Sequence, residues 1–72
     1  MTPTQLRAIL DRLGLSQLGA GRLLGTGERT PRRWASGESE VPSPVAIILR
    51  LLDAGVVTAE QIDAARRGKL VE

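Results

Sequence analysis

Apolar residues recur at helical spacing through most of this 72-residue chain, and turn-forming residues separate the runs. The first apolar stripe consists of Leu6, Ile9, Leu10 and Leu13. An α-helix places these four positions on one face. Thr2 and Gln5 have the spacing of a capping box, and Pro3 between them suits a first helical position. We therefore expect a helix that begins after Thr2 and ends at Gly14, where glycine can adopt the left-handed conformation.

A second helix is expected over residues 17–24, with Ser16 as its N-cap and Gly25 as its end. Its expected inward positions are Leu18, Gly21 and Leu24. The two glycines inside it, at positions 19 and 21, each cost about 1 kcal/mol relative to alanine. Tertiary packing, rather than intrinsic propensity, is therefore expected to hold this helix together.

A third helix is expected to start near residues 27–28 and to end at Gly37. Pro31 falls in its first turn, where a missing N–H is tolerated because the early amides lack helical partners. Thr30 and Trp34 share one face. Trp34 is the only aromatic residue of the chain, and we expect it in the core, where it seals this helix against the next one.

The fourth expected helix has Ser43 as its cap and Pro44 at its first position. Its body, residues 45–52, is apolar almost all round, which is typical of a helix buried on more than one side. A fifth helix, about residues 59–67, begins with a capping box of Thr58 and Gln61. Its expected inward residues are Ala59, Ile62 and Ala65. The sequence thus predicts one all-α domain over residues 1–72, a compact bundle of about five short helices.

Charge adds a local feature to this picture, since the net charge is only +2 and every basic residue except Lys69 is arginine. Residues 22–33 contain Arg22, Arg29, Arg32 and Arg33. Glu28 is the one acidic residue among them. Arginine has a planar fork that fits phosphate and the edge of guanine, so the cluster favours an anionic partner. A solvated helix face is the alternative interpretation of the same charges.

The composition argues against several other classes of protein. The chain has no cysteine and no histidine, which excludes a disulfide framework and the common zinc sites and removes the usual general base. The carboxylates are scattered, with no metal-ligand spacing, so we expect no enzyme, no metal, no cofactor and no small-molecule ligand. Arg50 and Asp53 interrupt the most apolar run, so we expect no membrane span. The start of the sequence is polar, so we expect no signal peptide. We expect a cytoplasmic location.

The segment from residue 17 to residue 37 carries the strongest functional signal. Two short helices are joined by a tight turn at Gly25, and the small residue Gly21 lies four positions earlier, where we expect the helices to approach closely. This is the sequence form of a helix-turn-helix, whose second helix enters the DNA major groove.

The chain here resembles the lambda-repressor-like, Cro-type (XRE) helix-turn-helix family over about residues 6–52. The matching pieces are Leu15-Ser16-Gln17, Leu23-Leu24-Gly25, Arg29-Thr30-X-Arg32-Arg33-Trp34 and Ser36-Gly37, followed by the loop with Pro42 and the apolar helix. The departures from the family pattern are Pro31 for an aliphatic residue, Gly27 for a Ser or Thr cap, and Gly21 for alanine.

The resemblance implies a set of DNA contacts. The implied base contacts are Glu28, Arg29, Arg32 and Arg33, and the implied phosphate contacts are Gln17, Arg22, Thr26, Gly27 and Ser43. Arginine binds guanine O6 and N7, and glutamate accepts from the cytosine amino group. Arg7 is a further phosphate candidate. Three of the residues keep structural alternatives: Glu28 complements a helix dipole, Ser43 is a cap, and Gln17 is an ordinary first-turn residue.

The implied function is sequence-specific binding of double-stranded DNA by a transcriptional regulator, an autoregulatory repressor that binds a palindromic operator as a homodimer. Compact phage repressors, including the regulators that accompany anti-CRISPR genes, have this form. We expect the dimerisation segment within residues 44–72. The expected interface residues are Ile47, Leu51, Val56, Val57, Ile62 and Leu70. An antitoxin of the same fold, which binds a toxin protein and represses its own operon, is the alternative hypothesis.

Overall fold

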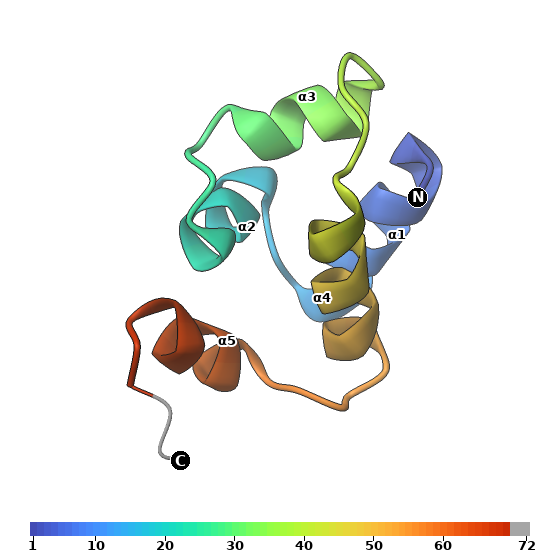
Figure 1. Ribbon diagram of the computed structural model, residues 1–72. Coiled ribbons are helices and arrows are strands. Elements are labelled where there is room, and N and C mark those ends of the chain that lie inside the picture. Colours follow the sequence, from blue (N-terminus) through green and yellow to red (C-terminus); the bar gives the residue numbers. More distant parts are fainter. Residues whose placement is uncertain (70–72) are drawn as a thin grey trace.

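The computed structural model describes residues 1–69 and contains five α-helices in that range. The helices are α1 (Pro3–Leu13), α2 (Gln17–Leu24), α3 (Thr30–Ser36), α4 (Ser43–Asp53) and α5 (Ala59–Arg66). Residues 1–69 contain no strand, which confirms the all-α class. Figure 1 shows α3 across one end of the molecule and the connection between α4 and α5 at the opposite end.

The predicted capping boxes are both present. At the start of α1, the Gln5 amide donates to Thr2 Oγ1 at 3.1 Å and the Thr2 amide donates to Gln5 Oε1 at 2.8 Å. The Thr58 and Gln61 pair makes the same two bonds at the start of α5, at 3.1 and 2.9 Å. Each box satisfies two amides that the first turn of a helix leaves without partners.

The core lies between α1, α3 and α4, with a smaller contribution from α2. Its buried residues are Leu6, Ile9, Leu10, Ala20, Trp34, Ala35, Leu49 and Leu52. Helix α1 packs against both α3 and α4, while α2 packs against α3 and α5. The predicted core position of Trp34 is confirmed, because its residue surface is only 3% exposed. Burial of Trp34 and Ala35 fixes one face of α3 against the bundle.

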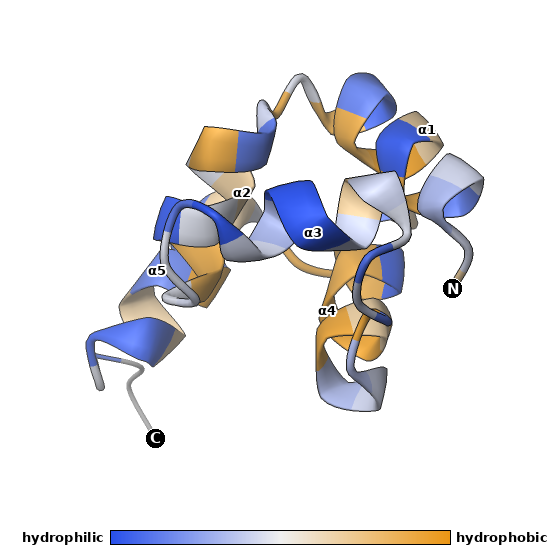
Figure 2. Ribbon diagram, turned by 90° about the horizontal axis from the view of Figure 1, so that it is seen from above, coloured by the Kyte–Doolittle hydropathy of each residue, from blue (hydrophilic) through white to orange (hydrophobic). Residues whose placement is uncertain are grey.

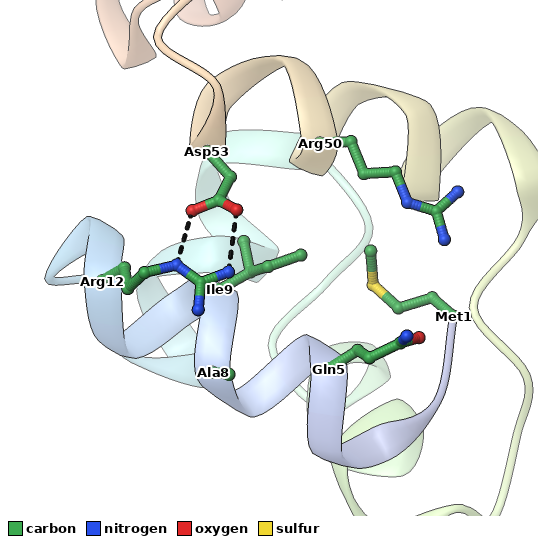
Figure 3. Close-up of a pocket in the computed structure, with 7 residues that line it drawn as sticks. All are labelled: Met1, Gln5, Ala8, Ile9, Arg12, Arg50 and Asp53. Carbon is green, nitrogen blue, oxygen red and sulfur yellow. Dashed lines mark hydrogen bonds and ion pairs between the residues drawn. The ribbon is translucent and has the colours of Figure 1, made fainter.

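A bidentate ion pair joins α1 to α4 beside this core. Arg12 Nε donates to Asp53 Oδ1 and Arg12 Nη2 donates to Asp53 Oδ2, each at 2.8 Å. Figure 3 shows the pair at the edge of a small pocket that Met1 and Arg50 also line. The hydrogen bond from Arg12 lowers the pKa of Asp53, and the pKa of Arg12 is raised in return.

Two helix starts differ from the sequence prediction. Helix α3 begins at Thr30 rather than near residues 27–28, because Gly27 has φ +86° and lies outside any right-handed helix. Ser43 is not the cap of α4: the N-cap is Pro42, and no side chain bonds to the first turn. The reason is that the Ala46 amide already donates to the Pro42 carbonyl at 3.0 Å, so the helix starts one residue earlier.

Three predicted inward positions are also wrong. Leu18 is 41% exposed because the face of α2 that packs inward is centred on Ala20 and Gly21, and Leu18 lies at its edge. Ala59 and Ala65 are exposed as well, and α5 has no fully buried residue. Helix α5 packs chiefly against α2, so most of its surface stays uncovered. Ile62 is half-buried, as a residue on that covered side should be.

No helix within residues 1–69 combines the length and the apolar character that crossing a membrane requires.

Candidate nucleic-acid interface

Helix α3 has one buried face and one charged face. The buried side chains are Pro31, Trp34 and Ala35, and the exposed ones are Arg29, Arg32, Arg33 and Ser36. The buried residues have the helical spacing i, i+3, i+4, and the exposed residues have the spacing i, i+3, i+4, i+7. Arg29 fits the second spacing because it already has right-handed helical dihedral angles at the N-cap. Figure 2 shows a strongly hydrophilic stretch in the middle of α3. The sequence therefore directs Arg29, Arg32 and Arg33 away from the core together, and we call the surface that they form the arginine face.

The three arginines of this face have no carboxylate partner in residues 1–69. The ion pairs there involve Arg12, Arg22, Arg66 and Arg67 instead. Arg29, Arg32 and Arg33 line one open depression with Ser36 and Glu38. A concave surface with three guanidinium groups that make no internal ion pair is suited to an anionic ligand.

The turn between α2 and α3 depends on a close approach of backbone to backbone. Gly21 is buried, and a Cβ on it would overlap the carbonyl of Gly27 and lie 3.3 Å from Pro31 Cδ. The Thr26 amide donates to the Gly21 carbonyl at 3.1 Å. Thr30 Oγ1 donates to the Thr26 carbonyl at 2.9 Å. The small residue expected at position 21 thus sets the angle at which α3 leaves the turn.

Arg22 and Glu28, predicted as a phosphate contact and a base contact, lie together. Arg22 Nη2 is 3.3 Å from Glu28 Oε1, and the two side chains are 68% and 61% exposed. An ion pair this exposed contributes little stability because water and salt screen it. Glu28 lies in the turn just before Arg29 and is exposed, and its weak pair with Arg22 can open for a ligand.

Gln17 is half-buried at the first position of α2 and lines an open depression with Arg7. The Arg7 guanidinium donates from Nη1 to the carbonyl of Ala35, near the end of α3. Arg7 therefore binds the last turn of α3, where cations are favoured by the helix dipole. The sequence carried no signal for this contact, since the two residues are 28 positions apart.

The remaining predicted phosphate contacts lie in the turn and at the start of α4. The Thr26 amide donates to the Gly21 carbonyl at 3.1 Å, and the Thr26 hydroxyl donates to the Gly27 carbonyl at 3.4 Å, a long and exposed bond. Gly27 and Ser43 are exposed. Ser36 was not predicted as a site residue, although it lies seven positions after Arg29 and the helical repeat would have found it.

Three of the residues predicted for the dimer interface form an exposed apolar patch. Ile47, Leu51 and Val56 are 57%, 36% and 66% exposed, and the Val56 amide donates to the Leu51 carbonyl at 3.0 Å. We call these three residues the α4 patch. Val57 and Ile62 instead pack, half-buried, against the core. Leu70 lies outside the described residues.

No grouping of three or more acidic side chains with metal-site geometry occurs in residues 1–69. In the comparisons with known proteins, no family model, no curated protein and no solved structure matches this chain.

Proposed function

We propose that this protein is a sequence-specific regulator that binds double-stranded DNA and represses its own operon as a homodimer. The observation that carries the proposal is the face of α3, where Arg29, Arg32 and Arg33 are exposed side by side and pair with no carboxylate of residues 1–69. Phosphate contacts supply most of the affinity of such proteins, and arginine is well suited both to phosphate and to guanine.

The placement of α3 supports major-groove binding. The major groove is about 12 Å wide and admits an α-helix. The buried face of α3 packs against α1 and α2. The arginine face lies on the other side of the helix and is therefore clear of other helices. In this proposal α2, the turn and α3 act as a helix-turn-helix. Gln17 and Arg22 then contact phosphates on either side of the groove, and the Thr26 hydroxyl does so by exchanging its long bond to the Gly27 carbonyl for a bond to phosphate.

The α4 patch supports a dimer. A single DNA-binding domain of this size contacts few base pairs. Helix-turn-helix dimers gain affinity by binding two half-sites about one helical turn apart. The patch runs along α4 to the connection with α5, which Figure 1 places at the other end of the molecule from α3. A second copy docked there leaves α3 free for DNA.

A gel-shift assay tests the proposal. The purified protein is mixed with the DNA upstream of its own gene, with random DNA as competitor and with salt varied. The variant Arg32→Ala/Arg33→Ala is compared with Arg50→Ala, an exposed arginine of α4 that lines the pocket next to Met1. We expect a salt-sensitive complex that survives the competitor, is lost in the double variant and is retained in Arg50→Ala.

Absence of any complex, or equal loss in Arg50→Ala, would contradict DNA binding by α3. The exposed α4 patch would then favour the second candidate, an antitoxin-type protein whose main partner is another protein. Co-purification with the product of a neighbouring gene, through a contact that Leu51→Glu abolishes, is the observation that would support it.

A further inference from the structure

We infer that α3 reads guanine, so that each half-site of the operator is G·C-rich at the base pairs that α3 contacts. This inference rests on the proposed function and adds the class of DNA sequence that the protein selects. It follows from which side chains α3 exposes and which it buries.

The side chains that read adenine are missing from the exposed face of α3. Adenine is recognised by the bidentate amides of Asn and Gln. The chain contains no Asn, and its Gln residues are Gln5, Gln17 and Gln61. Gln5 and Gln61 are engaged in the two capping boxes, and Gln17 opens α2. None of them belongs to α3.

The apolar groups that read thymine are buried. The thymine methyl group is recognised by contact with Ala, the methyl of Thr, or an aromatic ring. In α3, Ala35 is 4% and Trp34 3% exposed. Thr30 is half-buried, and its hydroxyl is bonded to the Thr26 carbonyl. The side chains of α3 that remain exposed are Arg32, Arg33 and Ser36.

The exposed groups can bind both bases of a G·C pair. Arg29, Arg32 and Arg33 each present a fork for guanine O6 and N7. Glu28, the exposed residue just before Arg29, can accept from the cytosine amino group once its exposed pair with Arg22 opens. Ser36 is neutral in this respect, because a hydroxyl bonds to either kind of pair and its Oγ already donates to the Arg33 carbonyl at 3.1 Å. The chemistry of the face therefore selects guanine.

The first experiment is selection of bound duplexes from a pool with a randomised central segment, using the full-length protein. We expect enriched half-sites with consecutive G·C pairs. Each guanine in the best site is then replaced by 7-deazaguanine, which keeps base pairing but lacks the N7 acceptor. Affinity should fall by about five-fold or more at each guanine that an arginine reads.

A specificity switch gives the sharper test. Arg29→Gln, Arg32→Gln and Arg33→Gln each replace a guanine reader by an adenine reader, and at least one should move the preference at a single position from G to A. Arg50→Gln removes the same charge from α4 and should leave every preference unchanged. Far-ultraviolet circular dichroism confirms that each variant is folded.

The outcomes separate this inference from the proposed function. Specific binding to A·T-rich half-sites, or binding that 7-deazaguanine does not affect, would overturn guanine reading and leave DNA binding standing. Binding without any sequence preference would also overturn it, because the arginines would then contact phosphates alone. Failure to bind any duplex at low salt would overturn both proposals.

Discussion

Gly21 of α2 lies directly against the carbonyl group of Gly27: a Cβ on Gly21 would lie 3.2 Å from the carbonyl carbon of Gly27 and still closer to its oxygen. Backbone cannot move aside as a flexible side chain can. Gly27 itself has φ +86°, a conformation that favours glycine, and Pro31 closes the same contact from α3. Gly21, Gly27 and Pro31 therefore lie next to one another.

Gly21→Ala is expected to lower the free energy of unfolding by up to about 2 kcal/mol. Overpacking a close contact costs about 1–3 kcal/mol, while the gain in helix propensity returns only about 1 kcal/mol. Urea denaturation followed by circular dichroism measures the change. Gly19→Ala is the matched control in the same helix, because its Cβ would meet the Ser16 hydroxyl at 3.1 Å rather than backbone. Equal or greater destabilisation by Gly19→Ala would contradict the role of the Gly21 contact.

Asp53→Asn is expected to destabilise the protein at neutral pH. The hydrogen bond from Arg12 lowers the pKa of Asp53 in the folded state, so the ion pair stabilises the fold above the ordinary aspartate pKa of about 3.9. That stabilisation is lost as the pH falls through the folded-state pKa, because the carboxylate is then protonated in both states. The difference in unfolding free energy between wild type and variant should therefore shrink below about pH 4.

Urea titrations at several pH values measure this difference. Asp11→Asn is the control, since Asp11 is an exposed carboxylate of α1 that makes no ion pair within residues 1–69. A pH-independent difference for Asp53→Asn, or the same pH dependence for Asp11→Asn, would show that the Arg12 pair is not the cause.

Arg33→Ala is expected to weaken binding to the preferred DNA site by about 1–3 kcal/mol if Arg33 reads a base. Binding to random DNA should change much less. Fluorescence anisotropy with a labelled duplex, repeated over a range of salt concentrations, separates the two effects. An equal loss on all sequences, together with a shallower salt dependence, would make Arg33 a phosphate contact. Arg50→Ala should bind as the wild type does.

Ile47→Glu and Leu51→Glu are expected to convert a dimer into monomers, because each places a carboxylate in the α4 patch, where the proposed second copy would bury it without a partner. Sedimentation velocity over a range of protein concentrations measures the mass. Leu18→Glu is the control, since Leu18 is also an exposed leucine, 41% accessible, but lies on α2. A wild-type protein that stays monomeric at every concentration, or a Leu18→Glu variant that also dissociates, would contradict an interface at α4.

The sequence by itself determined most of the helices and the residues of the arginine face. The capping boxes at Thr2 and Thr58 act between residues three apart, so local spacing was enough to predict both. The exposure of Arg32 and Arg33 follows from the helical repeat once Trp34 is assigned to the core. Interactions within one turn of a helix depend on neighbours in the sequence and not on how the helices pack.

Only the tertiary structure decided the contacts between helices. The Arg12 bond to Asp53 spans 41 positions and the Arg7 bond to the Ala35 carbonyl spans 28, and neither has a local signature. The start of α3 depends on the dihedral angles of Gly27, which the approach of Gly21 constrains. The exposure of Leu18 depends on which face of α2 meets its neighbours. These features depend on how the surfaces of two helices pack together. The residue pattern of one helix is compatible with several such packings and does not select one of them.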